Sequence, residues 1–179
     1  MTGPVPFEVD DAIVLLLGTP SKSPALRGRL EGITRLEKLV FLLENETPLG
    51  GRLTESPEFV PHNFGPFSQK VYQAIELLSA AGLVNDSASI AVTKEDSWES
   101  DEIIGDEPEK LYTTRDFELT SRGRRYYDAL LKELPPDTEQ IVGDLKSRFG
   151  AMPLRQLIRY VYARYPPMTS KSLIKEKIL

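Results

Sequence analysis

A strongly acidic stretch in the middle of the chain limits how the rest can fold. Residues 85–109 carry nine acidic side chains and one basic side chain, and they show no sustained helical or strand period. Blocks of like charge usually stay hydrated and do not enter a hydrophobic core. A packed core must therefore come from residues 1–84 and 110–179. The acidic stretch between them is either a solvated loop or a regulatory arm.

The two flanking parts have the composition of a folded protein and differ in charge. Of 179 residues, 40% are apolar and 27% are charged, which is enough apolar material for one or two compact units. Residues 1–84 have a net charge of −3, and residues 110–179 have a net charge of +6. A basic last third beside an acidic loop indicates contact with an anionic partner or pairing within the chain.

The sequence contains neither an export signal nor a membrane span. Its first residues lack the basic region and long apolar run of a secretory signal. The most apolar stretch, residues 12–17, is far shorter than the ~20 residues that a membrane helix needs. We expect a cytoplasmic protein with no membrane partner.

The types of residue present argue against most catalytic and metal chemistry. The chain has no cysteine, which excludes disulfides, thiol nucleophiles, zinc ribbons and iron–sulfur sites. A Ser–His–acid triad would have to use His62, the single histidine, and no Gly-x-Ser-x-Gly motif accompanies it. The carboxylates between 99 and 109 lack the spacing of a calcium loop. We expect no enzyme activity, no cofactor and no metal, with His62 as a structural residue that hydrogen-bonds its turn.

Turn residues and apolar periodicity divide the chain into helices and short extended segments. Ser68 is a typical N-cap and Gly82 a typical C′ residue, so they bound one helix. Thr34 and Glu37 have capping-box spacing at the start of another. The expected helices are 9–17, 33–46, 69–81, 121–134, 137–149, 152–165 and 170–178; the expected extended segments are 58–63, 83–84 and 111–119, with 21–32 as a connector.

This order predicts a mainly α protein with a small antiparallel β hairpin, organised as a winged helix-turn-helix core plus a C-terminal helical extension. Residues 83–84 and 117–119 would pair as the strands of the wing, and residues 85–110 would be an acidic insertion in it. In that fold, the helix before the hairpin faces the ligand. The core is expected over 1–134, and the extension over 135–179 is expected to pack on it.

Several motifs resemble a known family. Residues 34–42 read Thr-Arg-Leu-Glu-Lys-Leu-Val-Phe-Leu, and residues 64–68 read Phe-Gly-Pro-Phe-Ser before Val71-Tyr72. Together with Leu-Thr-Ser-Arg-Gly at 119–123 and the Tyr- and Arg-rich segment 157–166, they are similar to the YwgA-like proteins. A more distant similarity is to the Panacea domain of antitoxin-like proteins. The resemblance implies a small, mostly helical, non-enzymatic prokaryotic protein with a winged-helix-like core.

The first candidate site is the start of the helix over 69–81. Free N–H groups at a helix N-terminus can hold a phosphate oxygen, and glutamine can bridge adenine in the major groove. The predicted nucleic-acid contacts are Ser68, Gln69, Lys70 and Gln73, with phosphate contacts from Arg122, Arg124 and Arg125. A tight turn with a cap also explains the first set, and arginines paired with the chain's own acidic residues also explain the second.

The second candidate site lies near the C-terminus. Arg155, Arg159, Tyr160 and Arg164 combine the two residue types that dominate interfaces, and they are the predicted partner-binding residues. Tyrosines at helical spacing also occur as ordinary core residues. We expect a non-catalytic protein that binds double-stranded DNA in a regulatory or defence role. The alternative is an antitoxin-like adaptor that binds another protein, and a homodimer through the C-terminal helices is a further expectation.

Overall fold

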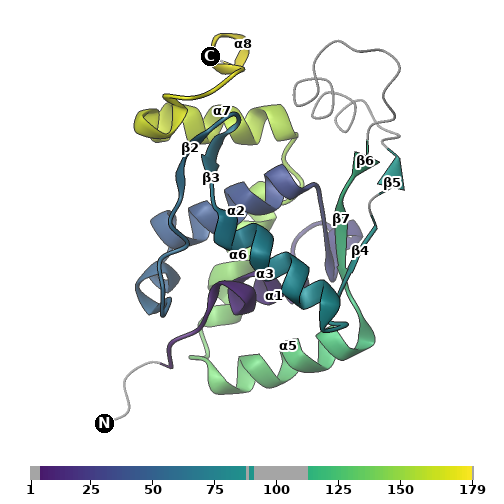
Figure 1. Cartoon of the computed structure of the whole chain (residues 1–179). Coiled ribbons are helices and arrows are strands. Elements are labelled where there is room, and N and C mark those ends of the chain that lie inside the picture. Colours follow the sequence, from purple (N-terminus) through teal and green to yellow (C-terminus); the bar gives the residue numbers. More distant parts are fainter. Residues whose placement is uncertain (1–4, 88, 91–112, 179) are drawn as a thin grey trace.

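The structure is a computed structural model that describes residues 5–87, 89–90 and 113–178, and this part of the chain is mainly helical with small antiparallel sheets (Figure 1). The helices are α1 (Val9–Gly18), α2 (Ile33–Glu46), α3 (Gln69–Ala80), α5 (Ser121–Glu133), α6 (Thr138–Phe149), α7 (Leu154–Arg164) and α8 (Lys175–Ile178). The strands are β1 (Arg29–Glu31), β2 (Val60–His62), β3 (Gly65–Phe67), β4 (Val84–Asp86), β5 (Ser89–Ile90), β6 (Thr113–Thr114) and β7 (Asp116–Leu119). Three 3-10 helices join them: η1 (Pro24–Leu26), η2 (Pro48–Arg52) and η3 (Pro166–Thr169).

Helix α1 lies at the centre of the core. Its residues from Ala12 to Leu17 are all fully buried, because α2, α3, α5 and α6 pack around it. A helix that is apolar on every side can only be stable when other elements cover it in this way. The mainly helical architecture predicted from the sequence is thus confirmed.

A three-stranded antiparallel sheet closes one side of the core, in the order β1-β7-β4. Val84 pairs with Leu119 and Asp86 with Phe117, so the two strands predicted on either side of the acidic stretch do pair. Strand β1 falls within the segment predicted to be a connector. Its three residues are too few to show a period, and it becomes a strand because Leu30 packs into the core opposite Phe117.

A β2–β3 hairpin precedes α3, where the sequence predicts an extended segment and a turn. His62 pairs with Gly65 and Val60 pairs with Phe67. Gly65 has φ +90°, and a Cβ placed there would lie 2.7 Å from Cε1 of Tyr162. Glycine is therefore required both by the backbone conformation and by the close approach of α7.

The predicted capping box of Thr34 and Glu37 is wrong. Helix α2 begins at Ile33, and its N-cap is Gly32 with φ +89°. The Glu37 side chain is 2% exposed and instead accepts a hydrogen bond from the backbone N–H of Ser68. The hairpin and the start of α3 therefore attach to a carboxylate in the middle of α2.

The C-terminal helices share the core of the N-terminal ones. Helix α6 packs against α1 and α2, and α7 packs against α2. Phe149, Tyr162 and Ile178 belong to the same buried cluster as the apolar residues of α1. None of the helices in the described ranges is long and apolar enough to cross a bilayer.

Candidate functional site

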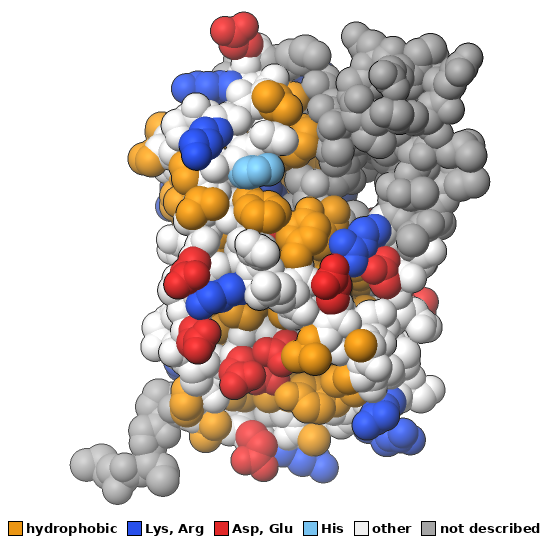
Figure 2. Space-filling model, viewed as in Figure 1, with side chains coloured by type: hydrophobic (Ala, Val, Ile, Leu, Met, Phe, Trp, Pro, Cys, Tyr) orange, Lys and Arg blue, Asp and Glu red, His pale blue; other side chains and the backbone are white. Residues whose placement is uncertain are grey.

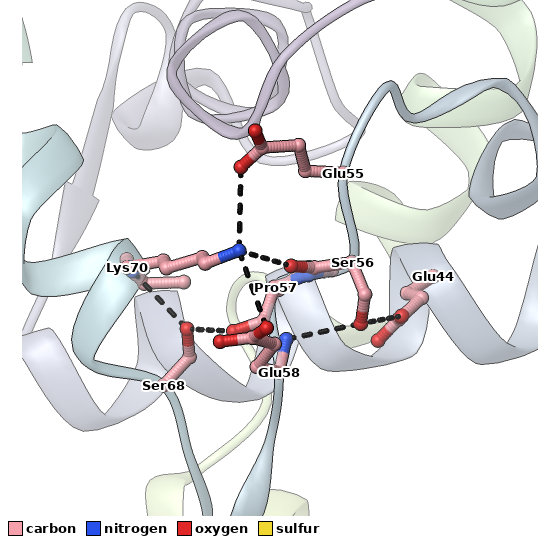
Figure 3. Close-up of polar contacts among 8 residues, drawn as sticks. Glu44, Glu55, Ser56, Pro57, Glu58, Ser68 and Lys70 are labelled. Atoms are coloured by element: carbon pink, nitrogen blue, oxygen red, sulfur yellow. Dashed lines mark hydrogen bonds and ion pairs between the residues drawn. The ribbon is translucent and has the colours of Figure 1, made fainter.

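Ser68 does not offer its side chain to a ligand. It is fully buried, its hydroxyl donates to the carbonyl of Pro57, and the same oxygen accepts the N–H of Val71 at 3.2 Å (Figure 3). Ser68 is the N-cap of α3, as predicted, and its hydroxyl makes both of these hydrogen bonds within the chain. A contact between Ser68 and a base would have to compete with these two hydrogen bonds.

Lys70 is neutralised by its own chain. Its ammonium nitrogen lies 3.3 Å from a carboxylate oxygen of Glu55 and 3.6 Å from one of Glu58, and it donates to the carbonyl of Ser56 (Figure 3). Gln69 and Gln73 are exposed on α3. Of the four residues predicted to contact nucleic acid here, Gln69 and Gln73 are the two whose side chains are exposed.

A groove of about 350 Å³ lies beside Gln73, between α3 and the start of α1. We call it the α3 groove; its lining residues are Glu8, Val9, Asp10, Thr54, Glu55, Lys70, Gln73, Ala74 and Leu77. Leu77 is 61% exposed, which is unusual for a large apolar side chain. Figure 2 shows hydrophobic and acidic side chains gathered on this face of the molecule. The groove therefore combines an exposed apolar anchor with a carboxylate rim.

The carboxylates at the start of α1 are crowded together. The negative charges of Asp10 and Asp11 raise the pKa of Glu8 above its usual value. Glu55 on the opposite side of the groove adds another carboxylate, which is mostly exposed. Glu8, Asp10 and Glu55 face one cation in the groove, Lys70, which pairs with Glu55, so the lining has a net negative charge that disfavours phosphate and favours a cation.

The predicted phosphate-binding arginines have different environments. Arg124 donates to the carbonyl of Gly18 at 3.2 Å, so it holds the C-terminal end of α1 rather than a ligand. Arg122 and Arg125 are exposed, and neither forms an ion pair with another residue in the described part of the chain. Arg115 binds Asp86 with Nη2–Oδ2 2.7 Å, which is the pairing with the acidic region that the sequence allows as an alternative. Lys110 and the carboxylates between 99 and 109 lie outside the described residues.

The predicted partner-binding residues near the C-terminus are largely engaged within the chain. The carboxylate of Glu46, at the end of α2, accepts hydrogen bonds from Tyr160, Arg164 and Tyr165. Arg159 donates to the carbonyl of Ile178 at 2.9 Å. Arg155 is exposed on α7. Tyr160, Arg159 and Arg164 thus fasten α7 to α2 and α8, which leaves less of this surface for a partner than the sequence predicts.

A cavity under the β2–β3 hairpin contains residues that the sequence analysis did not select. It has a volume of about 160 Å³, and we call it the Glu37 cavity; its lining residues are Thr34, Glu37, Lys38, His62, Asn63, Phe64, Gly65, Pro66, Phe67 and Tyr72. The side chains of Glu37 and Lys38 are each 2% exposed. Two adjacent charges inside an otherwise apolar helix, residues 36–43, are the signal that could have pointed here.

His62 lies at the rim of this cavity. Its ring stacks on that of Phe67, with 4.7 Å between the ring centroids, and its side chain is exposed. The prediction that it hydrogen-bonds the turn is wrong, because ring stacking on β3 holds it instead.

Comparison of the sequence with models of known protein families and with curated proteins finds no match.

Proposed function

We propose that residues 9–134 form a winged-helix core. Apart from the β2–β3 hairpin between α2 and α3 and the short strands β5 and β6, the order α1-β1-α2-α3-β4-β7 is that of a winged helix, which has three helices and a sheet whose last two strands flank the wing. This order and the sheet order β1-β7-β4 support the proposal. The resemblance to the YwgA-like and Panacea proteins favours the same fold. Helix α3 then occupies the position that a winged helix presents to its partner.

We infer that this core acts as a non-catalytic module that binds a basic segment of another protein in the α3 groove. The observation that carries this inference is the exposed Leu77 beside the carboxylates of Glu8, Asp10 and Glu55. An exposed apolar side chain in a groove is a typical anchor for a partner, and the charge around it determines whether a basic or an acidic partner is favoured. A basic amphipathic helix has both features, an apolar stripe and lysines or arginines at its edges.

Replacing Leu77 with serine tests this function. The probe is a fluorescent helical peptide with leucines at helical spacing and lysines elsewhere, and its affinity is measured by anisotropy. We expect Leu77→Ser to weaken binding by about tenfold or more, because the variant loses the apolar anchor but keeps the charge of the groove. Leu173→Ser is the matched control, because Leu173 is 63% exposed and lies outside the groove. Equal losses in the two variants would contradict the proposal.

Binding of double-stranded DNA is the second candidate function, and the exposed pair Arg122 and Arg125 favours it. The two residues are three positions apart near the start of α5, so they share a face that can contact adjacent phosphates. The carboxylates around α3 oppose this candidate, because they would repel the phosphates of any duplex that also contacted α3.

A double substitution of these arginines separates the two functions. If DNA is the partner, Arg122→Ala with Arg125→Ala lowers the slope of log affinity against log salt by about 2, since each phosphate contact contributes about 0.9. Lys175→Ala, an exposed cation on α8, is the control and leaves the slope unchanged. The measurement is a salt titration with a mixed-sequence duplex. An affinity for DNA that is independent of salt would remove this candidate.

A further inference from the structure

The Glu37 cavity has room for one ring-sized group. Its volume of about 160 Å³ is close to the ~150 Å³ that suffices for a benzene molecule in a protein core. It is well below the ~300 Å³ at which pockets for larger organic ligands begin. Aromatic side chains form much of its wall: His62, Phe64, Phe67 and Tyr72. The shape and lining suit a small planar group.

The carboxylate of Glu37 gives the cavity a strong hydrogen-bond acceptor. Both of its oxygens face one donor, the N–H of Ser68, at 3.0 Å and 3.4 Å. An ionised carboxylate can accept about four hydrogen bonds, and buried ones normally have several donors. Glu37 therefore has acceptor capacity left over in a place that water reaches poorly.

The neighbouring cation, Lys38, favours the ionised form of Glu37 through its charge, and its ammonium also binds β3. The ammonium of Lys38 donates to the carbonyl of Pro66 at 2.9 Å, which ties α2 to β3. The hydroxyl of Thr34 adds a further polar atom to the wall. A ligand with several N–H donors and a flat apolar face would satisfy both the carboxylate and the rings.

We propose that the Glu37 cavity binds a guanidinium group, supplied by an arginine side chain of the basic partner. This proposal rests on the function proposed above for the source of the arginine. A guanidinium is planar, stacks on aromatic rings and presents a fork of N–H donors that matches a carboxylate. A lysine ammonium is compact and strongly hydrated, so it fits a flat aromatic cavity less well.

The first turns of α3 contribute residues both to the cavity and to the α3 groove. Tyr72 lines the cavity, whereas Lys70 and Gln73, on the same turns of α3, line the groove. The single histidine marks the rim of the cavity in Figure 2, on the same face as the acidic side chains near α3. An arginine near one end of a basic helix would therefore enter the cavity while the apolar stripe covers Leu77.

Binding should also release a proton. Burial raises the pKa of Glu37 well above 4.5, against the lowering effects of the Lys38 charge and the N–H of Ser68, so the folded protein holds this proton more tightly than an unperturbed carboxyl does. A guanidinium beside it favours the ionised form and displaces the proton. The other titratable groups that line the cavity are Lys38, His62 and Tyr72. Calorimetric titration of the wild type with methylguanidinium, in two buffers with different ionisation enthalpies, measures the proton released. An equal binding enthalpy in the two buffers would contradict the role of Glu37.

The direct test is an NMR titration of the full chain with methylguanidinium. We expect saturable shifts of backbone amides in 62–72 for the wild type, and an affinity lower by about tenfold or more in Glu37→Gln, which loses the charge but keeps the shape. Glu76→Gln, at an exposed carboxylate of α3, is the matched control and should bind as the wild type does. The comparison ligands are methylammonium, a compact cation, and cytidine, a planar uncharged base with N–H donors. Tighter binding of either one, or equal binding by Glu37→Gln, would overturn the proposal.

The same reagents separate this inference from the proposed function. Leu77→Ser should lose the leucine–lysine peptide and still bind methylguanidinium as the wild type does. If methylguanidinium fails to bind while Leu77→Ser still loses the peptide, the cavity proposal is wrong and the groove stands. If methylguanidinium binds but Leu77→Ser and Leu173→Ser behave alike with the peptide, the groove is wrong and the cavity stands.

Discussion

Lys146→Met is expected to lower the free energy of unfolding by about 2–3 kcal/mol, because buried carbonyls lose their hydrogen-bond donor. Removal of the buried amine, whose pKa is lowered by burial to about 7, recovers part of the loss. Lys146 is fully buried in α6, and its ammonium donates to the carbonyls of Leu17, Thr19 and Leu26 at 2.8–2.9 Å. Methionine fills similar space but donates no hydrogen bond. Three buried carbonyls would then lose a donor that water cannot replace.

The position of these carbonyls increases the cost. Two of them belong to the C-terminal end of α1 and the residue after it, where the helix dipole is negative and a cation is stabilising. Arg124 donates to the carbonyl of Gly18 at the same end, so it is already engaged with a different acceptor. The end of the central helix would be the first region to loosen.

Urea unfolding followed by circular dichroism measures this effect. In a chain of this size, a loss of that magnitude corresponds to a fall in melting temperature of roughly 4–12 °C. Lys132→Met, at an exposed position of α5, is the control and should change stability by less than about 0.5 kcal/mol. A Lys146→Met protein within about 1 kcal/mol of the wild type would show that the three hydrogen bonds contribute little net stability.

The order of the elements could be predicted because it depends on local signals. Apolar runs and capping residues place α1, α3 and α5 within a residue or two of the structure, and Gly82 has the left-handed φ of +75° expected after α3. Strand β1 could not be predicted, because its pairing with β7 joins residues far apart in the sequence. Residues 29–31 form a strand only when α1 and β7 are in place.

The candidate site was harder to predict, because exposure and pairing depend on tertiary contacts. The sequence shows that Ser68 caps a helix, but it does not show that Pro57 covers the hydroxyl. It shows a basic α5, but not that Arg124 reaches Gly18. Glu37 is the clearest case: its position among apolar residues of a helix could be seen, whereas its burial follows from the hairpin that packs on it.

Glu37→Gln is expected to make stability much less dependent on pH. The pKa of Glu37 is raised to about 8 in the folded protein and is 4.5 when the side chain is unperturbed, so between these values the folded state binds more protons than the unfolded state. Stability contributed by this group is therefore present at low pH and is lost as the pH rises from about 4.5 to 8. The full loss is on the order of a few kcal/mol, since one unit corresponds to about 1.4 kcal/mol.

The measurement is the difference in unfolding free energy between Glu37→Gln and the wild type at each pH. The difference cancels groups common to both proteins, such as Lys146, whose pKa is lowered by burial to about 7. Glutamine still accepts the N–H of Ser68, so the hairpin keeps its attachment to α2. The Lys38 ammonium loses a neighbouring carboxylate in Glu37→Gln, and this interaction is part of the titration of Glu37, because the carboxyl ionises over the same pH range. We therefore expect the difference to shift in favour of Glu37→Gln by a few kcal/mol between about pH 5 and pH 8.

The exposed carboxylate Glu76 supplies the matched control for this pH dependence. Glu76→Gln should follow the wild-type curve, because Glu76 is exposed on α3 and lies outside the Glu37 cavity. A constant difference for Glu37→Gln across the range would mean that the carboxylate is already ionised in the folded protein. Lys38 and the N–H of Ser68 would then stabilise the charge, and binding of a guanidinium would release no proton. The stability curve and the methylguanidinium titration thus examine the same carboxylate by independent measurements.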